Sequence, residues 1–127
     1  MKLAKILAFS TGFLMATTPA LAEASEGELG YAKGSLGYDA LIAGDNQTAI
    51  DQLMSAKGVD ADDPARLINL GQAYLRTGRS GEAAEMFTAA MNSNRSFALV
   101  LADGSVINSR KAAKMALRNM NNRLAHR

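Results

Sequence analysis

The middle of the chain carries apolar residues at helical spacing, with small residues set among large ones. They fall three, four and seven positions apart, which places them on one side of a helix. The first face consists of Leu67, Leu70, Gly71 and Tyr74, and the second of Ala83, Phe87 and Ala90. We expect two helices to pack closely here, with Gly71 and Ala83 letting the backbones approach.

Residues that start and stop helices flank both faces. Asp63 can cap the first helix and Pro64 suits its first position, where the missing N–H has no helical partner. Gly78 is expected to end this helix at about residue 77. Ser80 is expected to cap a second helix that reaches about residue 93.

The same pattern occurs once more, 34 residues earlier. Leu36 aligns with Leu70, Gly37 with Gly71, Leu41 with Leu75, Gly44 with Gly78, Ala49 with Ala83, Leu53 with Phe87 and Ala56 with Ala90. In the earlier unit, Gly44 and Asn46 occupy the positions of Gly78, which ends a helix, and of Ser80, which is expected to cap one. A period of this length is typical of stacked helical units. Ten positions are predicted to form the packing surface: Leu36, Gly37, Ala49, Leu53, Leu70, Gly71, Tyr74, Ala83, Phe87 and Ala90.

The later unit, Leu67-x2-Leu70-Gly71-x2-Tyr74 followed by Gly78, Ala83-x3-Phe87 and Ala90, resembles the tetratricopeptide repeat. The resemblance implies a mostly α fold with two stacked helix-turn-helix repeats, at about residues 30–61 and 64–95. In that family the first helix of each repeat lines a concave, peptide-binding groove. The corresponding positions here are Gly34, Ser35, Tyr38, Leu41, Ile42, Ile68, Asn69, Gln72, Leu75 and Arg76. Among them, the candidate partner-binding residues are Tyr38, Asn69, Gln72 and Arg76.

The segment from Phe97 to Asn108 does not continue the repeat. Asp103-Gly104 favours a two-residue hairpin turn that would set Leu101 opposite Val106 and Val100 opposite Ile107. The alternative is a helix over residues 97–102, ended by Gly104. The β-branched residues favour the hairpin.

A last helix is predicted after Ser109, which is expected to cap it. Its apolar stripe is Ala113, Leu117, Met120 and Leu124, and its other side is basic, with Arg110, Lys111, Lys114 and Arg118. Two repeats leave an apolar end exposed. We therefore expect residues 95–127 to supply a hairpin and a basic amphipathic helix that covers this end.

Residues 1–22 have the layout of a secretory signal peptide. Lys2 and Lys5 flank the start of an apolar run that leads to the small-residue site Ala20-Leu21-Ala22. We expect cleavage after Ala22, export to the periplasm and no membrane span in the mature chain. An uncleaved membrane tether and release to the medium are the alternatives.

The composition of the chain excludes several kinds of catalytic and metal-binding site. The chain of 127 residues has no cysteine, which excludes disulfides and thiolate chemistry. His126 is its one histidine and lies beside the terminus, so a multi-histidine metal site is excluded. Asp60, Asp62 and Asp63 lack the spacing of a calcium loop. We expect no catalysis, no cofactor and no metal.

Charge is unevenly distributed. Residues 23–94 carry five basic and eleven acidic side chains, whereas residues 95–127 carry seven basic and one acidic. Such asymmetry is typical of a dipolar surface or of a basic site for an acidic partner.

The sequence thus predicts a non-catalytic interaction module that binds another protein or peptide in its groove, and no nucleic acid. One alternative is docking of the basic helix to an acidic surface, such as anionic lipid or envelope polymer. Another is a subunit whose repeats stack on those of a larger assembly. The oligomeric state stays open.

Overall fold

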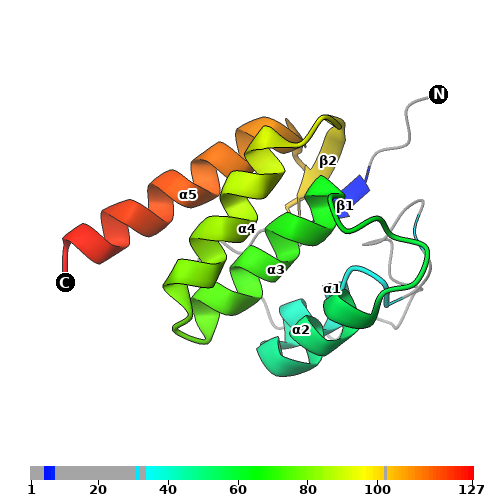
Figure 1. The fold of residues 1–127 in the computed structure, drawn as a ribbon, viewed down its shortest axis with the longest axis horizontal. Helices are drawn as coiled ribbons and strands as arrows, with labels where there is room; N and C mark the ends of the chain where they lie inside the picture. Colours follow the sequence, from blue (N-terminus) through cyan, green and yellow to red (C-terminus); the bar gives the residue numbers. More distant parts are fainter. Residues whose placement is uncertain (1–4, 8–30, 32–33, 102) are drawn as a thin grey trace.

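Five helices and three short strands make up the described part of the chain. The computed structural model describes residues 5–7, 31, 34–101 and 103–127. In chain order the elements are β1 (Lys5–Leu7), α1 (Tyr38–Ala43), α2 (Asn46–Ser55), α3 (Pro64–Arg76), α4 (Ser80–Asn92), β2 (Ala98–Leu101), β3 (Val106–Asn108) and α5 (Ser109–Ala125) (Figure 1). The fold is mostly helical, with two helical pairs, a short antiparallel hairpin and a last helix, as the sequence predicts.

The second helical pair, α3 and α4, forms the centre of the core. Asp63 caps α3 by accepting hydrogen bonds from the backbone N–H groups of Ala65 and Arg66, at 2.9 and 3.3 Å. Gly78 follows the helix with a φ of 80°, a conformation that suits glycine. Both predictions for this helix, the Asp63 cap and the Gly78 stop, are confirmed.

Gly71 makes the close approach between these two helices possible. A Cβ atom added to Gly71 would lie 2.5 Å from the Phe87 ring, which is itself fully buried. Gly71 therefore allows the close packing of α3 and α4 that the sequence predicts. The aromatic ring of Phe87 fills the space that the missing side chain of Gly71 leaves, and Ala83 is buried nearby on the same helix.

The first helical pair is shorter at its start. Gly34 and Gly37 have φ values of 82° and 62°, in the left-handed region, so α1 begins only at Tyr38 and has six residues. Gly37 lies against Ala49 of α2, where an added Cβ would meet the Ala49 backbone at 3.1 Å. Leu36, Ala49 and Leu53 are fully buried, as the repeat predicts.

Three predicted helix caps are each one residue too late. Asn46, Ser80 and Ser109 are the first residues of α2, α4 and α5, and the cap positions are Asp45, Arg79 and Asn108. The Asp45 side chain accepts from the backbone N–H of Thr48 at 3.1 Å, and the side chain of Asn108 accepts from Arg110 at 3.0 Å. Asp45 and Asn108 are capping residue types like their neighbours Asn46 and Ser109, so the sequence offers two adjacent candidates at each of these starts. The Arg79 side chain makes no capping hydrogen bond.

The segment after α4 forms the predicted hairpin, but in a different register. Val100 pairs with Val106 and Leu99 with Ile107. The N–H of Leu101 donates to Ser105 at 2.8 Å, and the N–H of Gly104 donates to Leu101 at 2.8 Å. Three residues, not two, therefore connect the strands, with Gly104 at a φ of 81°, a common three-residue hairpin geometry.

β1 completes a sheet of three strands in the order β1-β2-β3. It pairs in parallel with β2, matching Lys5, Ile6 and Leu7 to Leu99, Val100 and Leu101. β1 also contacts α3. The rest of the predicted signal peptide lies outside the described residues, and its cleavage stays a prediction.

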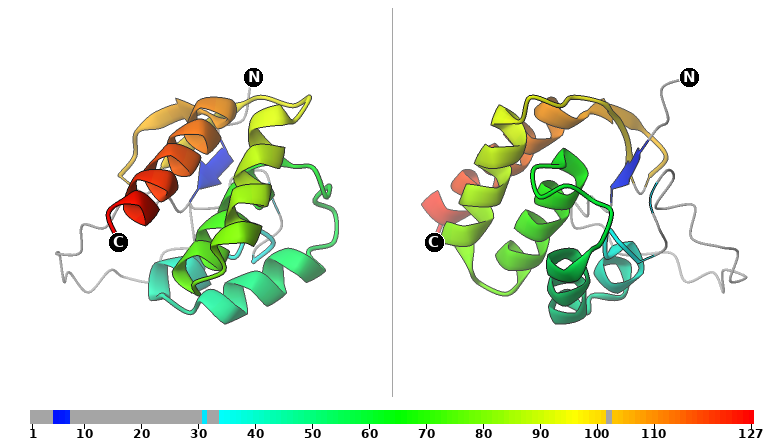
Figure 2. Two further views of the ribbon diagram at one scale, coloured as in Figure 1. Left: turned by 60° about the vertical axis from the view of Figure 1, so that its left-hand side comes forward. Right: turned by 45° about the vertical axis from the view of Figure 1, so that its right-hand side comes forward.

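α5 covers the end of the second pair and runs antiparallel to α4 (Figures 1 and 2). Its buried residues are Ser109, Ala112, Ala113, Ala116 and Met120. Leu117 is half-buried and Leu124 is 45% exposed, so the predicted stripe is wrong at Leu124. The role of a covering helix is confirmed, with alanines in place of the expected leucines.

Candidate partner-binding surfaces

Asn69, a predicted groove residue, lies inside the fold. It is fully buried, and its Nδ2 donates to the backbone carbonyl of Leu36 in the first pair at 2.9 Å. Its Oδ1 atom has no hydrogen-bond partner among the described residues. The expectation that Asn69 is exposed along an open groove is therefore corrected.

The other three groove candidates are also partly or wholly covered. Arg76 donates from Nη1 to the carbonyl of Leu41 at 2.8 Å, and its burial lowers its pKa. Gln72 is 7% exposed. Tyr38 is half-buried, and burial together with the carboxylate of Asp39 raises its pKa. Arg76 thus caps the end of α1 in the described fold.

These polar side chains join the two helical pairs. Asn69 and Arg76 each reach a carbonyl about one repeat earlier in the chain. Arg66 reaches nearer carbonyls, one in the loop before α3 and one at the end of α2. The guanidinium of Arg66 donates to Val59 at 2.8 Å and to Met54 at 3.2 Å. Sequence reasoning missed Arg66, because nothing in a repeat pattern distinguishes a side chain that contacts the previous unit from one that contacts a ligand.

β1 marks the place where the fold holds an extended segment. It lies beside β2 and near the amino-terminal end of α3 (Figures 1 and 2). Leu99 of β2 is fully buried, and Val100 and Leu101 are half-buried. This side of the molecule therefore combines backbone groups of a strand with an apolar surface, two features that bind extended peptides.

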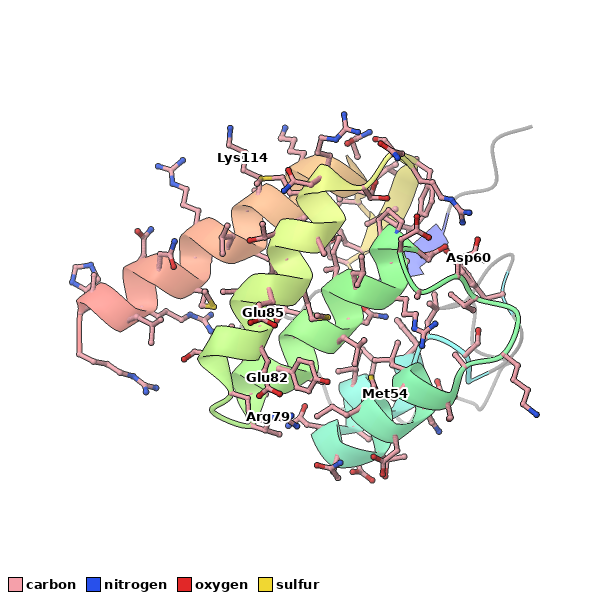
Figure 3. The ribbon with its side chains drawn as sticks, viewed as in Figure 1. Met54, Asp60, Arg79, Glu82, Glu85 and Lys114 are labelled. Atoms are coloured by element: carbon pink, nitrogen blue, oxygen red, sulfur yellow. The ribbon has the colours of Figure 1, made fainter. Side chains whose placement is uncertain are left out.

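The exposed side of α5 is basic. Lys111, Lys114 and Arg118 are exposed, and among the described residues none of them forms an ion pair. Figure 3 shows Lys114 pointing away from the body of the molecule. Arg110 is exposed too, but its Nη2 donates to the carbonyl of Ser93 at 3.1 Å. We call Lys111, Lys114 and Arg118 the basic stripe.

Folding separates the two signs of charge in space. α1 and α2 lie at the opposite end of the molecule from α5 (Figure 1). They carry Asp39 and Asp51, and Asp45 lies in the turn between them. The loop before α3 carries Asp60, Asp62 and Asp63, and Asp60 pairs with Arg95. The charge asymmetry of the sequence therefore becomes a dipolar surface, whose positive part is α5.

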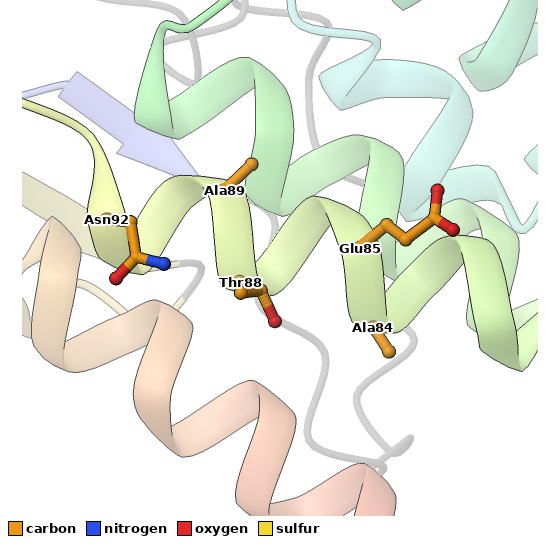
Figure 4. A pocket seen from close by; sticks show the side chains of 5 residues that line it. All are labelled: Ala84, Glu85, Thr88, Ala89 and Asn92. Carbon is orange, nitrogen blue, oxygen red and sulfur yellow. The ribbon is translucent and has the colours of Figure 1, made fainter.

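A shallow depression lies on α4, away from the residues discussed above. It has a volume of about 450 Å³ and is lined by Ala84, Glu85, Thr88, Ala89 and Asn92 (Figure 4). All five residues come from one helix, and four of them are exposed. The arrangement offers one carboxylate and no converging partner, so it holds no combination of groups suited to acid–base chemistry.

Tyr31 has a strongly raised pKa, and its hydroxyl contacts the residue that caps α3. The Tyr31 hydroxyl donates to both carboxylate oxygens of Asp63, at 3.0 and 2.9 Å. Burial, followed by the nearby Asp63 carboxylate, raises the pKa of Tyr31 far above its ordinary value. Because Asp63 also caps α3, the pair ties the chain before α1 to the start of the second pair.

No group of three or more potential metal ligands occurs within the described residues. None of the described helices is both long and apolar enough to span a membrane. No family model, curated protein or solved structure matches the chain. Its function must therefore be argued from the surfaces described above.

Proposed function

We propose that this chain is a non-catalytic, exported interaction module that binds an extended segment of a partner protein on the side where β1 contacts α3 and β2. The observation that carries the proposal is the position of β1 itself. This strand comes from a distant part of the sequence and lies extended beside β2 and against α3. A surface that accommodates its own extended strand suits a segment of another protein equally well.

The observed positions of Asn69 and Arg76 change which residues we assign to the binding surface. Asn69 and Arg76 hydrogen-bond to backbone carbonyls of the first pair, so we assign them to fold stability. The binding surface is instead assigned to β2 and to the neighbouring part of α3. Resemblance to the tetratricopeptide repeat supports the same general activity, since that family binds peptides on the first-helix side.

Site-specific photo-crosslinking in cells that express the protein would test the proposal. The crosslinking residue replaces Leu101 beside β1, Lys114 in the basic stripe or Glu85 on the outer face of α4. We expect a protein adduct from position 101 and none from position 85, which serves as the control. Absence of any protein adduct at position 101 would contradict the proposal.

A second candidate function is docking of α5 to an anionic surface, and the exposed basic stripe favours it. Each lysine or arginine near an anionic bilayer contributes about 1 kcal/mol of attraction. The stripe offers three such groups on one helix side. We take the surface to be the phosphate-bearing headgroups of anionic lipid.

Vesicle sedimentation distinguishes this candidate. Vesicles rich in phosphatidylglycerol would bind the chain at about 0.1 M salt and release it at about 1 M, where the Debye length falls from about 10 to about 3 Å. Changing Lys111, Lys114 and Arg118 to glutamine should abolish binding. Lys57→Gln, which removes an exposed lysine before α3, should leave it unchanged; equal loss in both would contradict a specific stripe.

A further inference from the structure

We infer that the edge of β2 facing β1 is an acceptor site for an extended, apolar segment of a partner protein, which adds as a strand parallel to β2. The inference rests on the proposed function and specifies its chemistry: backbone hydrogen bonds to β2 and apolar contacts beside it. β1 occupies this edge in the full chain. Export with cleavage after Ala22 would remove β1 and leave the edge available.

The backbone groups available at this edge follow from the hairpin register. Leu101 donates to Ser105, and Ser109 donates to Phe97. In an antiparallel pair, alternate residues direct their N–H and C=O groups to the same neighbour. Residues 97, 99 and 101 therefore bond towards β3, and the backbone groups of Ala98 and Val100 point to the edge that β1 occupies.

The hairpin has its own attachments on the other side. Besides the hydrogen bonds between β2 and β3, two side-chain bonds hold the hairpin. The Asn108 side chain donates to the Ser96 hydroxyl at 2.7 Å, and the N–H of Phe97 donates to the Ser109 hydroxyl at 3.2 Å. These bonds join β2, β3 and the start of α5 without any contribution from β1. Exchange of β1 for another strand therefore leaves the hairpin contacts in place.

The occupant must be extended and apolar. An unpaired strand edge presents N–H and C=O groups that a further strand can bond. Leu99 is fully buried, and Val100 and Leu101 are half-buried, so a segment with large apolar residues covers this surface better than a charged one. The parallel direction is the one in which β1 pairs. A proline in the centre of the segment would remove a ladder donor.

A peptide-binding experiment with proline substitutions tests the inference. The probe is a fluorescent peptide with the sequence of residues 2–9, KLAKILAF. The protein is the full chain, made by cell-free synthesis so that residues 1–22 are retained. Because Val100 pairs with Ile6, the residues of β1 on either side of Ile6 bond to β2. Leu7→Pro removes one of these donors, disrupts the chain's own β1 and should raise probe affinity about tenfold over the unmodified chain, as the gain of one or two hydrogen bonds implies.

Two further variants, each added to Leu7→Pro, identify the edge. Val100→Pro removes the donor that faces β1 but leaves the bonds to β3, so probe binding should be lost. Val106→Pro is the matched control, because Val106 pairs with Val100 and directs its N–H away from β2. It should bind the probe as Leu7→Pro alone does, and circular dichroism checks that each variant keeps its helices.

The outcomes separate the possibilities. Equal binding by the Val100→Pro and Val106→Pro variants, or no binding to a folded Leu7→Pro chain, would overturn strand addition. Crosslinking at position 101 without peptide addition would leave the proposed function standing and reject the parallel strand. Loss of the position 101 adduct would instead reject the proposed function itself.

Discussion

The two helical pairs occupy equivalent positions in the repeat but differ in how they are held. Gly71 lies inside a helix of 13 residues, whereas its counterpart Gly37 has a φ of 62° and precedes a helix of six. The second pair begins with Asp63-Pro64, and the aligned residues in the first are Leu29 and Gly30. A repeat position therefore specifies which residues are buried, whereas the residues before it decide where the helix begins.

The pairs also differ in their neighbours. α3 lies between the first pair and α4, and it contacts α5 as well. Arg76 of α3 holds a carbonyl of the first pair, and the residue that aligns with it, Ile42, is 57% exposed. The first pair thus receives polar contacts from the second and has an exposed apolar residue at the corresponding position, which implies that it is the less stable of the two.

The largest effect is expected from truncating the buried large residue at the equivalent position of each pair. Phe87→Ala should lower the free energy of unfolding by about 3 to 5 kcal/mol, because it removes a fully buried ring that packs against Gly71 of α3. Leu53→Ala should lower it by about 2 kcal/mol, since the shorter first pair can collapse around the cavity. Urea denaturation compares the two, and an equal or larger loss for Leu53→Ala would contradict the ranking.

The glycines should respond by different mechanisms. Gly71→Ala places a methyl group against the Phe87 ring and should cost about 1 to 3 kcal/mol. Adding Phe87→Leu should recover part of this loss, because the smaller side chain makes room. Gly37→Ala should cost about 1 to 2 kcal/mol through its left-handed backbone, and no change at Phe87 should rescue it. Thermal melts of the single and double variants would check this; a rescue of Gly37→Ala by Phe87→Leu would contradict the mechanism.

The two aspartate caps should also differ. Asp63 is 3% exposed and accepts from two backbone N–H groups and from Tyr31. Asp63→Ala should therefore cost about 2 kcal/mol, and Asp45→Ala, whose partner Thr48 lies at the surface, about 1 kcal/mol or less. Matching Asp→Asn variants retain a capping oxygen and serve as controls. Denaturation that shows the greater loss for Asp45→Ala would be the contrary result.

The contacts between the pairs can be weakened directly. Asn69→Ala and Arg76→Ala should each lower the free energy of unfolding by about 1 kcal/mol, because each leaves a carbonyl of the first pair without its donor. Arg118→Ala, at an exposed position, should change it by less than about 0.5 kcal/mol. Hydrogen exchange should show the loss of protection chiefly in α1 and α2. Unchanged exchange there would mean that the pairs are held together by apolar packing alone.

The smallest effect concerns Tyr31, which connects the chain before α1 to the second pair. The pKa of Tyr31 is raised in the folded protein, so the neutral hydroxyl stabilises the fold. This stabilisation is complete below the unfolded pKa of about 10 and declines as the pH rises above that value. Tyr31→Phe should reduce the loss of stability between about pH 9 and pH 11. Denaturation at both pH values measures the difference; an identical loss in the variant would contradict a role for the hydroxyl.

The sequence alone determined the local features whose cause is local. The repeat at 34 residues located buried positions such as Leu36, Leu53 and Phe87, since apolar periodicity reflects burial directly. Asp63-Pro64 and Gly78 set the ends of α3, because proline and glycine restrict the backbone wherever they occur. The β-branched residues favoured the hairpin, and the structure confirms it.

Only the tertiary structure decided where polar side chains bond and how strands pair. Asn69 and Arg76 have the spacing of an exposed face. Their side chains nevertheless donate hydrogen bonds to carbonyls of the first pair, 33 and 35 residues away in the sequence. The observed register of the hairpin differs by one residue from the predicted one, because its loop has three residues and a left-handed Gly104. The pairing of β1 with β2 joins segments more than ninety residues apart, and no local pattern in either segment specifies the other. Such contacts depend on distances in space, which a one-dimensional pattern does not contain.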